Sequence, residues 1–191
     1  MKVASILGSP RKKGTSTRIA QAFTDFMTEK GAEVVEYYLN GMSYKGCQGC
    51  EVCHSKQDCC VLKDDLTPAL DSMREVDVLV LSTPVYYGDI SGQFKMLIDR
   101  TWSHVDVDYN KADPYSSRIP EGKTAILILT QGETEDRHRD VIERYSVYLN
   151  LYGFDLKVVR ATSLASGMPD GDVSAAQAEV VSIANELIAD R

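Results

Sequence analysis

Short apolar segments alternate with amphipathic segments along this chain, and this alternation restricts the fold more than any other feature. Five segments are apolar or β-branched over strand length: 2–8, 32–39, 77–82, 123–130 and 154–161. Five others carry apolar residues at helical spacing: 16–30, 67–76, 91–102, 135–152 and 173–189. Strands connected through helices pair in parallel with right-handed crossovers. The sequence therefore predicts a doubly wound α/β fold, a three-layer sandwich around a five-stranded parallel sheet of flavodoxin-like order 2-1-3-4-5.

Charge and apolar run length exclude several classes of partner. The 191 residues include 21 basic and 28 acidic side chains, a formal net charge of −7, and the only basic run is 11–13. Nucleic-acid binding is therefore not expected. The longest apolar runs fall far short of the ~20 residues of a membrane span, and the first residues lack the apolar core of a signal peptide. We expect a cytoplasmic protein that binds no membrane.

Chain length and pattern predict one domain over 1–191, with a ligand site at one edge of the sheet. In doubly wound sheets, ligands bind outside the carboxyl ends of the strands at the topological switch point. Loops 9–15, 83–90 and 131–137 are therefore predicted to meet there. The segment at about 103–122 has no clear periodicity and is interpreted as an insertion beside this site.

The first of these loops has the composition of a phosphate site. Segment 8–17 reads GSPRKKGTST, so a basic turn leads into three consecutive hydroxyl residues at the start of a helix. Helix N-terminal amides, hydroxyl groups and Arg11 all attract phosphate oxygens. The spacing of Gly8 and Gly14 and the missing lysine exclude a Walker loop, and the chain contains no GxGxxG motif. An ordinary helix cap with a solvated basic turn is the alternative interpretation.

The second loop, TPVYYGDISG at 83–92, places two adjacent tyrosines at the switch point. Aromatic and glycine residues there would offer apolar surface and backbone hydrogen bonds to a flat ring system such as a flavin. The alternative is a tyrosine pair that packs on a neighbouring helix or on a dimer partner.

The third loop, TQGE at 130–133, follows a buried strand. Its position would let the backbone amides of Gln131 and Gly132 approach the same ligand. A glycine after a strand is also an ordinary turn residue.

The cysteines form a compact motif. All five lie within one loop, spaced C-x2-C-x2-C-x5-C with one more cysteine directly after: Cys47, Cys50, Cys53, Cys59 and Cys60. A reducing compartment disfavours structural disulfides, and overlapping x2 spacings are more typical of iron–sulfur ligation than of zinc sites. Gly46 and Gly49 would let backbone amides reach cluster sulfurs. Structural zinc, a thiol redox site and inert cysteines are the alternatives, and His54 is interpreted as a surface histidine.

Taken together, SPRKKGTST, TPVYYGDISGQFKMLIDR and the cysteine loop at 45–60 resemble the NADPH-dependent FMN reductase family of flavodoxin-like proteins, and within it the iron–sulfur flavoproteins. The resemblance implies three groups of FMN ligands. The phosphate group would be held by Ser9, Arg11, Thr15, Ser16 and Thr17. The isoalloxazine would be flanked by Pro84, Val85, Tyr86, Tyr87 and Gly88. The ring pocket would be completed by Thr130, Gln131 and Gly132.

The same resemblance implies that a [4Fe-4S] cluster is ligated by Cys47, Cys50, Cys53 and Cys59, with Cys60 as the alternative fourth ligand. It also implies a homodimer or homotetramer that brings the cysteine loop of one subunit near the flavin of another. The expected function is an FMN oxidoreductase that takes electrons from NAD(P)H or a carrier protein. It would pass them through the cluster to a small-molecule or protein acceptor such as ferredoxin, without an obligatory acid or base side chain. The alternatives are a non-enzymatic electron carrier and a cofactor-free or zinc-stabilised interaction protein.

Overall fold

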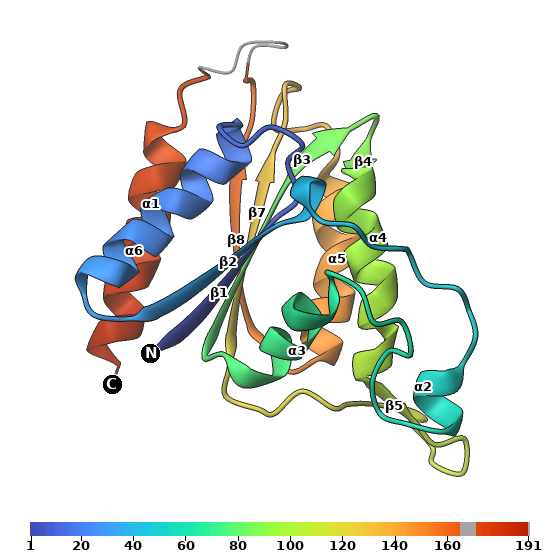
Figure 1. Cartoon of the computed structure of the whole chain (residues 1–191). Helices are drawn as coiled ribbons and strands as arrows, with labels where there is room; N and C mark the ends of the chain where they lie inside the picture. Colours follow the sequence, from blue (N-terminus) through green and yellow to red (C-terminus); the bar gives the residue numbers. More distant parts are fainter. Residues whose placement is uncertain (165–170, 191) are drawn as a thin grey trace.

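A parallel sheet between two layers of helices forms the centre of the computed structural model, which describes residues 1–164 and 171–190 (Figure 1). Its long strands are β1 (Lys2–Leu7), β2 (Glu33–Tyr38), β3 (Val78–Tyr86), β7 (Thr124–Thr130) and β8 (Asp155–Ala161). They lie in the order β2-β1-β3-β7-β8, and each neighbouring pair is parallel. The predicted flavodoxin-like order is confirmed.

The helices divide between the two faces of the sheet. The longer ones are α1 (Thr15–Glu29), α3 (Thr67–Glu75), α4 (Gly92–Arg100), α5 (Arg139–Leu151) and α6 (Ser174–Ala189). Figure 1 shows α1 and α6 on one face, and α3, α4 and α5 on the other. Short helical turns lie at Leu39–Gly41, at α2 (Val52–Ser55) and at Thr101–His104. Among the described residues, no helix is long and apolar enough to cross a membrane.

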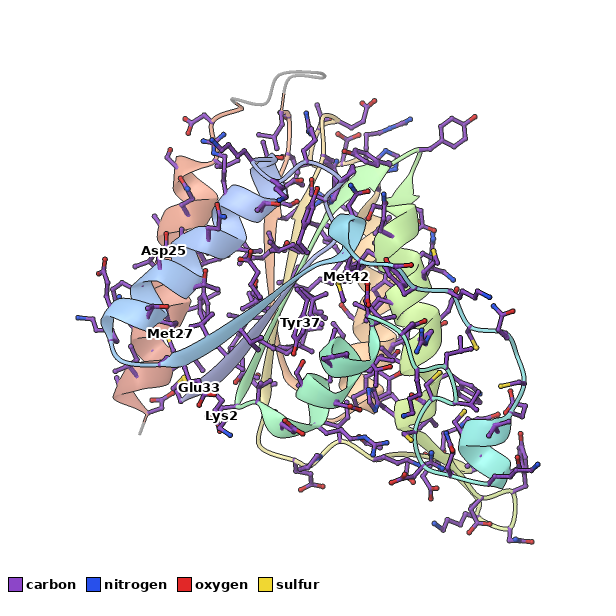
Figure 2. The ribbon with its side chains drawn as sticks, in the orientation of Figure 1. Lys2, Asp25, Met27, Glu33, Tyr37 and Met42 are labelled. Atoms are coloured by element: carbon purple, nitrogen blue, oxygen red, sulfur yellow. The ribbon has the colours of Figure 1, made fainter. Side chains whose placement is uncertain are left out.

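Strand alternation divides the apolar residues into two cores. Successive side chains of a strand point to opposite faces, so Val3 packs with Met27 of α1, whereas Ile6 packs with the core beneath α3, α4 and α5. Tyr37 of β2 packs against this second core, and its hydroxyl donates to the Pro68 carbonyl oxygen at 3.1 Å. Figure 2 labels Met27 and Tyr37 on these two sides. The helices are thus held by burial of apolar area, at roughly 25 cal/mol per Å².

Two predicted boundaries were wrong at the edge that carries the loops. The third strand continues from Ser82 to Tyr86, then reverses through Tyr87 and Gly88, both at positive φ, into β4 (Asp89–Ile90). Two consecutive positive-φ residues are the geometry of a tight hairpin. The helix predicted at 135–152 begins at Arg139 as α5, because His138 has a left-handed conformation that interrupts the helix.

The segment 103–122 is not beside the predicted ligand site. It forms a small antiparallel sheet of β5 (Val105–Val107) and β6 (Tyr115–Ser117), beyond the carboxyl end of α4. The loop after β3 leads into the other end of that helix. Figure 1 shows β5 beside α2, which belongs to the cysteine loop. The insertion therefore supports the cysteine loop instead of the edge of the sheet.

Candidate functional site

Three loops come together at the carboxyl ends of β1, β3 and β7. The Gly8 amide donates to the Ser82 carbonyl oxygen at 2.7 Å, and the Ser91 hydroxyl donates to the Gly8 carbonyl oxygen at 2.6 Å. The Thr15 hydroxyl donates to the Thr130 hydroxyl at 3.3 Å. Side chains and backbone from three distant parts of the sequence thus surround the amino end of α1.

The first loop folds tightly around that helix end. The Ser9 hydroxyl accepts a hydrogen bond from the Arg11 amide at 3.1 Å, and the Thr17 hydroxyl donates to the Arg11 carbonyl oxygen at 3.4 Å. A side chain on Gly14 would place its Cβ 2.7 Å from Ser9 Oγ, which real Cβ atoms do not tolerate. A larger residue at position 14 would therefore have to displace the Ser9 hydroxyl and crowd the Arg11 carbonyl oxygen, which lies 3.2 Å from the same Cβ position.

Ser16 is the polar group of this loop that the fold leaves unsatisfied. Its side chain is 1% exposed, and its hydroxyl has no hydrogen-bond partner within residues 1–164 and 171–190. Ser9, Thr15 and Thr17 are buried around it, while Arg11 is exposed. α1 has no side-chain cap and no acidic residue in its first turn. A buried hydroxyl beside uncapped helix amides fits a phosphate, because the anion would accept from both.

The second loop is a hairpin pinned to α5. Asp89 accepts hydrogen bonds from the Tyr145 hydroxyl and from Arg144 Nη1, both at 2.7 Å. Burial and the Asp89 carboxylate raise the pKa of Tyr145, so its hydroxyl stays protonated and donates. The hairpin then presents Tyr86 partly exposed and Tyr87 fully exposed. Tyr87 therefore does not pack on a neighbouring helix of this chain.

Other residues of the second loop occupy its base. Pro84 is paired with Thr130 inside the sheet, Val85 is half-buried, and Gly88 lies at the hairpin tip. A side chain on Gly88 would place its Cβ 3.6 Å from His138 Cε1. The loops after β3 and β7 therefore meet at this tip.

The third loop is organised by its own glutamine. The Gln131 amide donates to the Ala161 carbonyl oxygen at 2.9 Å, so the expectation that this amide faces a ligand was wrong. The side chain instead donates to the Thr134 carbonyl oxygen at 2.8 Å and accepts from Arg160 Nη2 at 2.8 Å. Gln131 thus shapes the loop, and Gly132 is left exposed on it.

Sequence reasoning missed Arg160 and His138 at this site. Arg160 also donates to the Glu135 carbonyl oxygen at 2.8 Å, so it anchors both ends of the third loop. The sequence feature that could have identified Arg160 is its place as a charged residue near the end of an apolar strand segment. For His138 the sequence offers no signal, since its contact with the hairpin depends on tertiary structure.

The cysteine loop is closed at its base by two adjacent acidic residues, Asp64 and Asp65. The Ser43 amide donates to Asp65 Oδ2 at 2.7 Å, and the Lys45 amide donates to Asp64 Oδ2 at 3.2 Å. Arg100 Nη1 donates to Asp64 Oδ2 at 2.7 Å. Burial raises the pKa of Asp64, but the Arg100 guanidinium and backbone amides outweigh burial and hold it below its usual value. The loop is thus fastened by an ion pair at its entry and exit.

The cysteine side chains line two hollows that share Cys60. One small hollow, next to Arg100, is lined by four of them: Cys47, Cys50, Cys53 and Cys60. Cys59 lines the second hollow together with Cys60, and its sulfur accepts from Lys63 Nζ at 3.9 Å. All five cysteines are free thiols, and within the described part of the chain no three ligating side chains already converge as a metal-holding group. Cys60 thus lines the hollow of the other three cysteines as well as the one that contains Cys59, whereas Cys59 does not line the first hollow.

Local contacts affect two of the cysteine sulfurs, those of Cys53 and Cys47. Burial raises the pKa of the Cys53 thiol, and the charges of Glu51, Cys60 and Cys50 raise it further. The Gly49 amide donates to Cys47 Sγ at 3.4 Å. The Cys47 sulfur thus accepts a backbone hydrogen bond in this loop.

His54 is not a surface histidine, contrary to the sequence interpretation. Its side chain is 10% exposed, and its ring nitrogens lie 2.9 Å from Glu51 Oε2 and 3.0 Å from the Val105 carbonyl oxygen. Its ring centroid lies 4.8 Å from that of Trp102. Arg118 adds a hydrogen bond from Nη1 to the Cys53 carbonyl oxygen at 2.7 Å. The insertion thus holds α2 in place.

Comparison with known proteins finds curated relatives that are similar to about half of this chain. Curated iron–sulfur flavoproteins of Methanocaldococcus jannaschii and Methanosarcina thermophila are 37% and 34% identical over 100 and 101 residues. These matches cover 52% and 53% of this chain and 50% and 52% of the relatives, so the similarity spans about half of each protein.

Solved structures share the whole fold. An FMN-dependent NADH-azoreductase from Bacillus anthracis, in complex with FMN, superposes with a TM-score of 0.74 at 16% identity, covering 98% of this chain and 99% of that one. An NAD(P)H:quinone oxidoreductase from Methanothermobacter marburgensis gives 0.63 at 17% identity, covering 97% and 94%. The family model for NADPH-dependent FMN reductase matches residues 1–170. The chain belongs to the NADPH-dependent FMN reductase family.

Proposed function

We propose that this protein is an FMN-dependent oxidoreductase that receives electrons from NAD(P)H or from a carrier protein. The observation that carries the proposal is the unsatisfied Ser16 hydroxyl, buried beside the uncapped amino end of α1. Family membership and the fold of the FMN-bound azoreductase support the same cofactor. The phosphate would be held by Ser9, Arg11, Thr15, Ser16 and Thr17.

The flavin ring would lie against the hairpin and the third loop. Its neighbours would be Pro84, Val85, Tyr86, Tyr87, Gly88, Thr130, Gln131 and Gly132, with Gln131 contributing through the loop that it shapes. FMN, when bound, supplies hydride acceptance and single-electron release. The chain contributes binding, orientation and an apolar aromatic surface, and we assign no side chain as acid or base.

We further propose that the cysteine loop holds a [4Fe-4S] cluster. Cys47, Cys50 and Cys53 would supply three ligands, and the fourth would come from Cys60 or Cys59. The shared hollow favours Cys60. The Gly49 amide directed at Cys47 Sγ and the names of the curated relatives support this group. The hollow has a volume of only about 20 Å³, so the cysteines must move apart; Cys47 and Cys50 are exposed and can shift.

We propose a homodimer as the working assembly, with a small molecule or a protein such as ferredoxin as electron acceptor. Fully exposed Tyr87 and largely exposed Val147 and Tyr148 support an apolar contact over α5 and the hairpin attached to it. Light scattering combined with size-exclusion chromatography tests the assembly, and a monomer at all concentrations would contradict it.

The deciding experiment is anaerobic purification followed by an absorption spectrum, with flavin, iron and sulfide measured on the same sample. Bound FMN and rapid oxidation of NADH or NADPH support the oxidoreductase. FMN with slow NAD(P)H oxidation but rapid exchange with ferredoxin indicates an electron carrier instead. A colourless protein with zinc, which fails to bind added FMN, would overturn both parts of the proposal.

A further inference from the structure

Arg100 is a buried cation at the wall of the cysteine hollow. Its side chain has no exposed area, and it lines the same hollow as Cys47, Cys50, Cys53 and Cys60. Its Nη1 and Nη2 groups are used by the base of the loop: Nη1 donates to Asp64 and to the Lys45 carbonyl oxygen, and Nη2 donates to the Leu62 carbonyl oxygen at 3.1 Å.

The remaining donor of Arg100 has no acceptor. Nε is fully buried and makes no hydrogen bond within residues 1–164 and 171–190. A buried donor without a partner destabilises a fold by about 1–3 kcal/mol, more for a charged group, so native structures rarely keep one without a reason. Four cysteine sulfurs line this hollow together with Gln48, Glu51 and Ser103. The Glu51 carboxylate already accepts from Trp102 Nε1, and the Ser103 hydroxyl donates to the Arg100 carbonyl oxygen. The sulfurs are therefore the acceptors that we consider for Nε, and thiolates or cluster sulfides accept more strongly than thiols.

We propose that Arg100 is the counter-charge of the cysteine cluster, with its Nε–H group donating to a cluster or cysteine sulfur and raising the reduction potential. This inference rests on the cluster part of the proposed function. Hydrogen bonds to the sulfurs and net charge around the cluster are two principal determinants of cluster potential. A cluster that gains an electron gains negative charge, so a neighbouring buried cation favours the reduced form. The Asp64 carboxylate, which is partly exposed, pairs with the guanidinium on the side that faces solvent and neutralises part of its charge.

The test measures the reduced cluster in the full-length protein, reconstituted with iron and sulfide without oxygen. Protein labelled with ¹⁵N at arginine is reduced with dithionite, and pulsed electron paramagnetic resonance searches for an arginine nitrogen coupled to the cluster. A coupled arginine nitrogen is expected. Because this measurement uses the unaltered sequence, it stays decisive even when substitution of Arg100 prevents folding.

Potentiometric titrations then compare Arg100→Gln, Arg100→Lys and Arg74→Gln. Arg74 is a matched control, since it binds Asp58 of the same loop but does not line the hollow shared by Cys47, Cys50 and Cys53; it lines the second hollow, with Cys59 and Cys60. At the midpoint potential of the unaltered protein, Arg100→Gln is expected to lower the ratio of reduced to oxidised cluster at least tenfold, about 59 mV for a one-electron couple. Arg100→Lys keeps the charge, so its ratio of reduced to oxidised cluster should lie between those of the unaltered protein and Arg100→Gln. Arg74→Gln should shift the ratio less than twofold.

The outcomes separate this inference from the function it rests on. A cluster that forms but shows no arginine coupling, or equal potentials in Arg100→Gln and Arg74→Gln, overturns the role of Arg100 alone. Protein that binds FMN but takes up no iron overturns both the role of Arg100 and the cluster, and leaves the flavin site intact.

Discussion

The Ser91 hydroxyl donates a 2.6 Å hydrogen bond to the Gly8 carbonyl oxygen, and the same oxygen atom of Ser91 accepts from the Phe94 amide at 3.4 Å. One side chain therefore caps α4 and fastens the loop after β1 to the loop after β3. Gly8, Ser91 and Phe94 are all buried, so neither hydrogen bond is exposed to water.

Replacement of Ser91 should therefore destabilise the fold and loosen the cofactor site together. Ser91→Ala removes a helix cap and leaves the Gly8 carbonyl oxygen without this donor, which should lower the free energy of unfolding by about 2 kcal/mol. Urea denaturation of the FMN-free protein measures the effect. Ser116→Ala, at an exposed serine of β6, is the control and should change stability by less than about 0.5 kcal/mol. Equal stability of the two variants would contradict the role of Ser91.

Ser16 should contribute to FMN affinity more than to stability. Ser16→Ala removes a hydroxyl that has no partner among residues 1–164 and 171–190 but would donate to the phosphate, so FMN should bind about tenfold more weakly. Fluorescence titration of the FMN-free protein gives the dissociation constant. Ser5→Ala is the matched control, because the Ser5 hydroxyl is also buried and unpartnered but lies within β1. A similar loss of affinity in both variants would show that the effect is indirect.

Much of the fold is predictable because the pattern of apolar residues within each strand indicates which faces of that strand are buried. The alternation in β1 sends Val3 and Ile6 to opposite cores, and β7 is buried along its whole length, as apolar runs at the centre of a parallel sheet are. Gly14 and the hydroxyl residues after it likewise indicated the first loop. These features depend on neighbours in sequence, so periodicity and composition are enough to identify them.

The remaining features depend on contacts between distant residues. Gln131 uses its amide and side chain to shape its own loop, and Arg160 from the next strand supports it. The Arg100 to Asp64 pair closes the cysteine loop across 36 positions. Tyr87 adopts a positive φ although it is not glycine. A single sequence gives no direct signal for such contacts, because the partner of a polar side chain is decided only when the elements pack.

The two adjacent cysteines should differ in their effect on the cluster. Cys60→Ser should lower the iron and sulfide bound after reconstitution well below the unaltered level, whereas Cys59→Ser should retain them, since only Cys60 shares the hollow of the other three cysteines. Iron, sulfide and FMN are measured on each variant, and unchanged FMN content shows that the fold is intact. Loss of iron in Cys59→Ser with retention in Cys60→Ser would reverse the assignment.

His104 should make the protein sensitive to mild acid. It is buried next to Arg74 and Arg118, and burial followed by the charge of Arg74 lowers its pKa from 6.5 to about 4. The unfolded chain therefore binds a proton as the pH falls through 6.5, whereas the folded chain stays neutral at His104 until about pH 4. Stability from this group is complete above pH 6.5 and is lost as the pH falls between these values, by about 2 kcal/mol from about pH 7 to about pH 5.

His104→Asn isolates this contribution, because it keeps an oxygen that can accept from Arg74 Nε, as His104 Nδ1 does at 3.1 Å, but it does not titrate. Urea denaturation at both pH values gives the free energy of unfolding of each protein. Carboxylates such as Asp64, whose pKa is lowered by Arg100, also lose stabilisation in acid in both proteins, so the difference between the two pH dependences belongs to His104. The variant should lose about 2 kcal/mol less than the unaltered protein over this interval. Parallel pH dependences would show that His104 takes up its proton equally in the folded and unfolded chains.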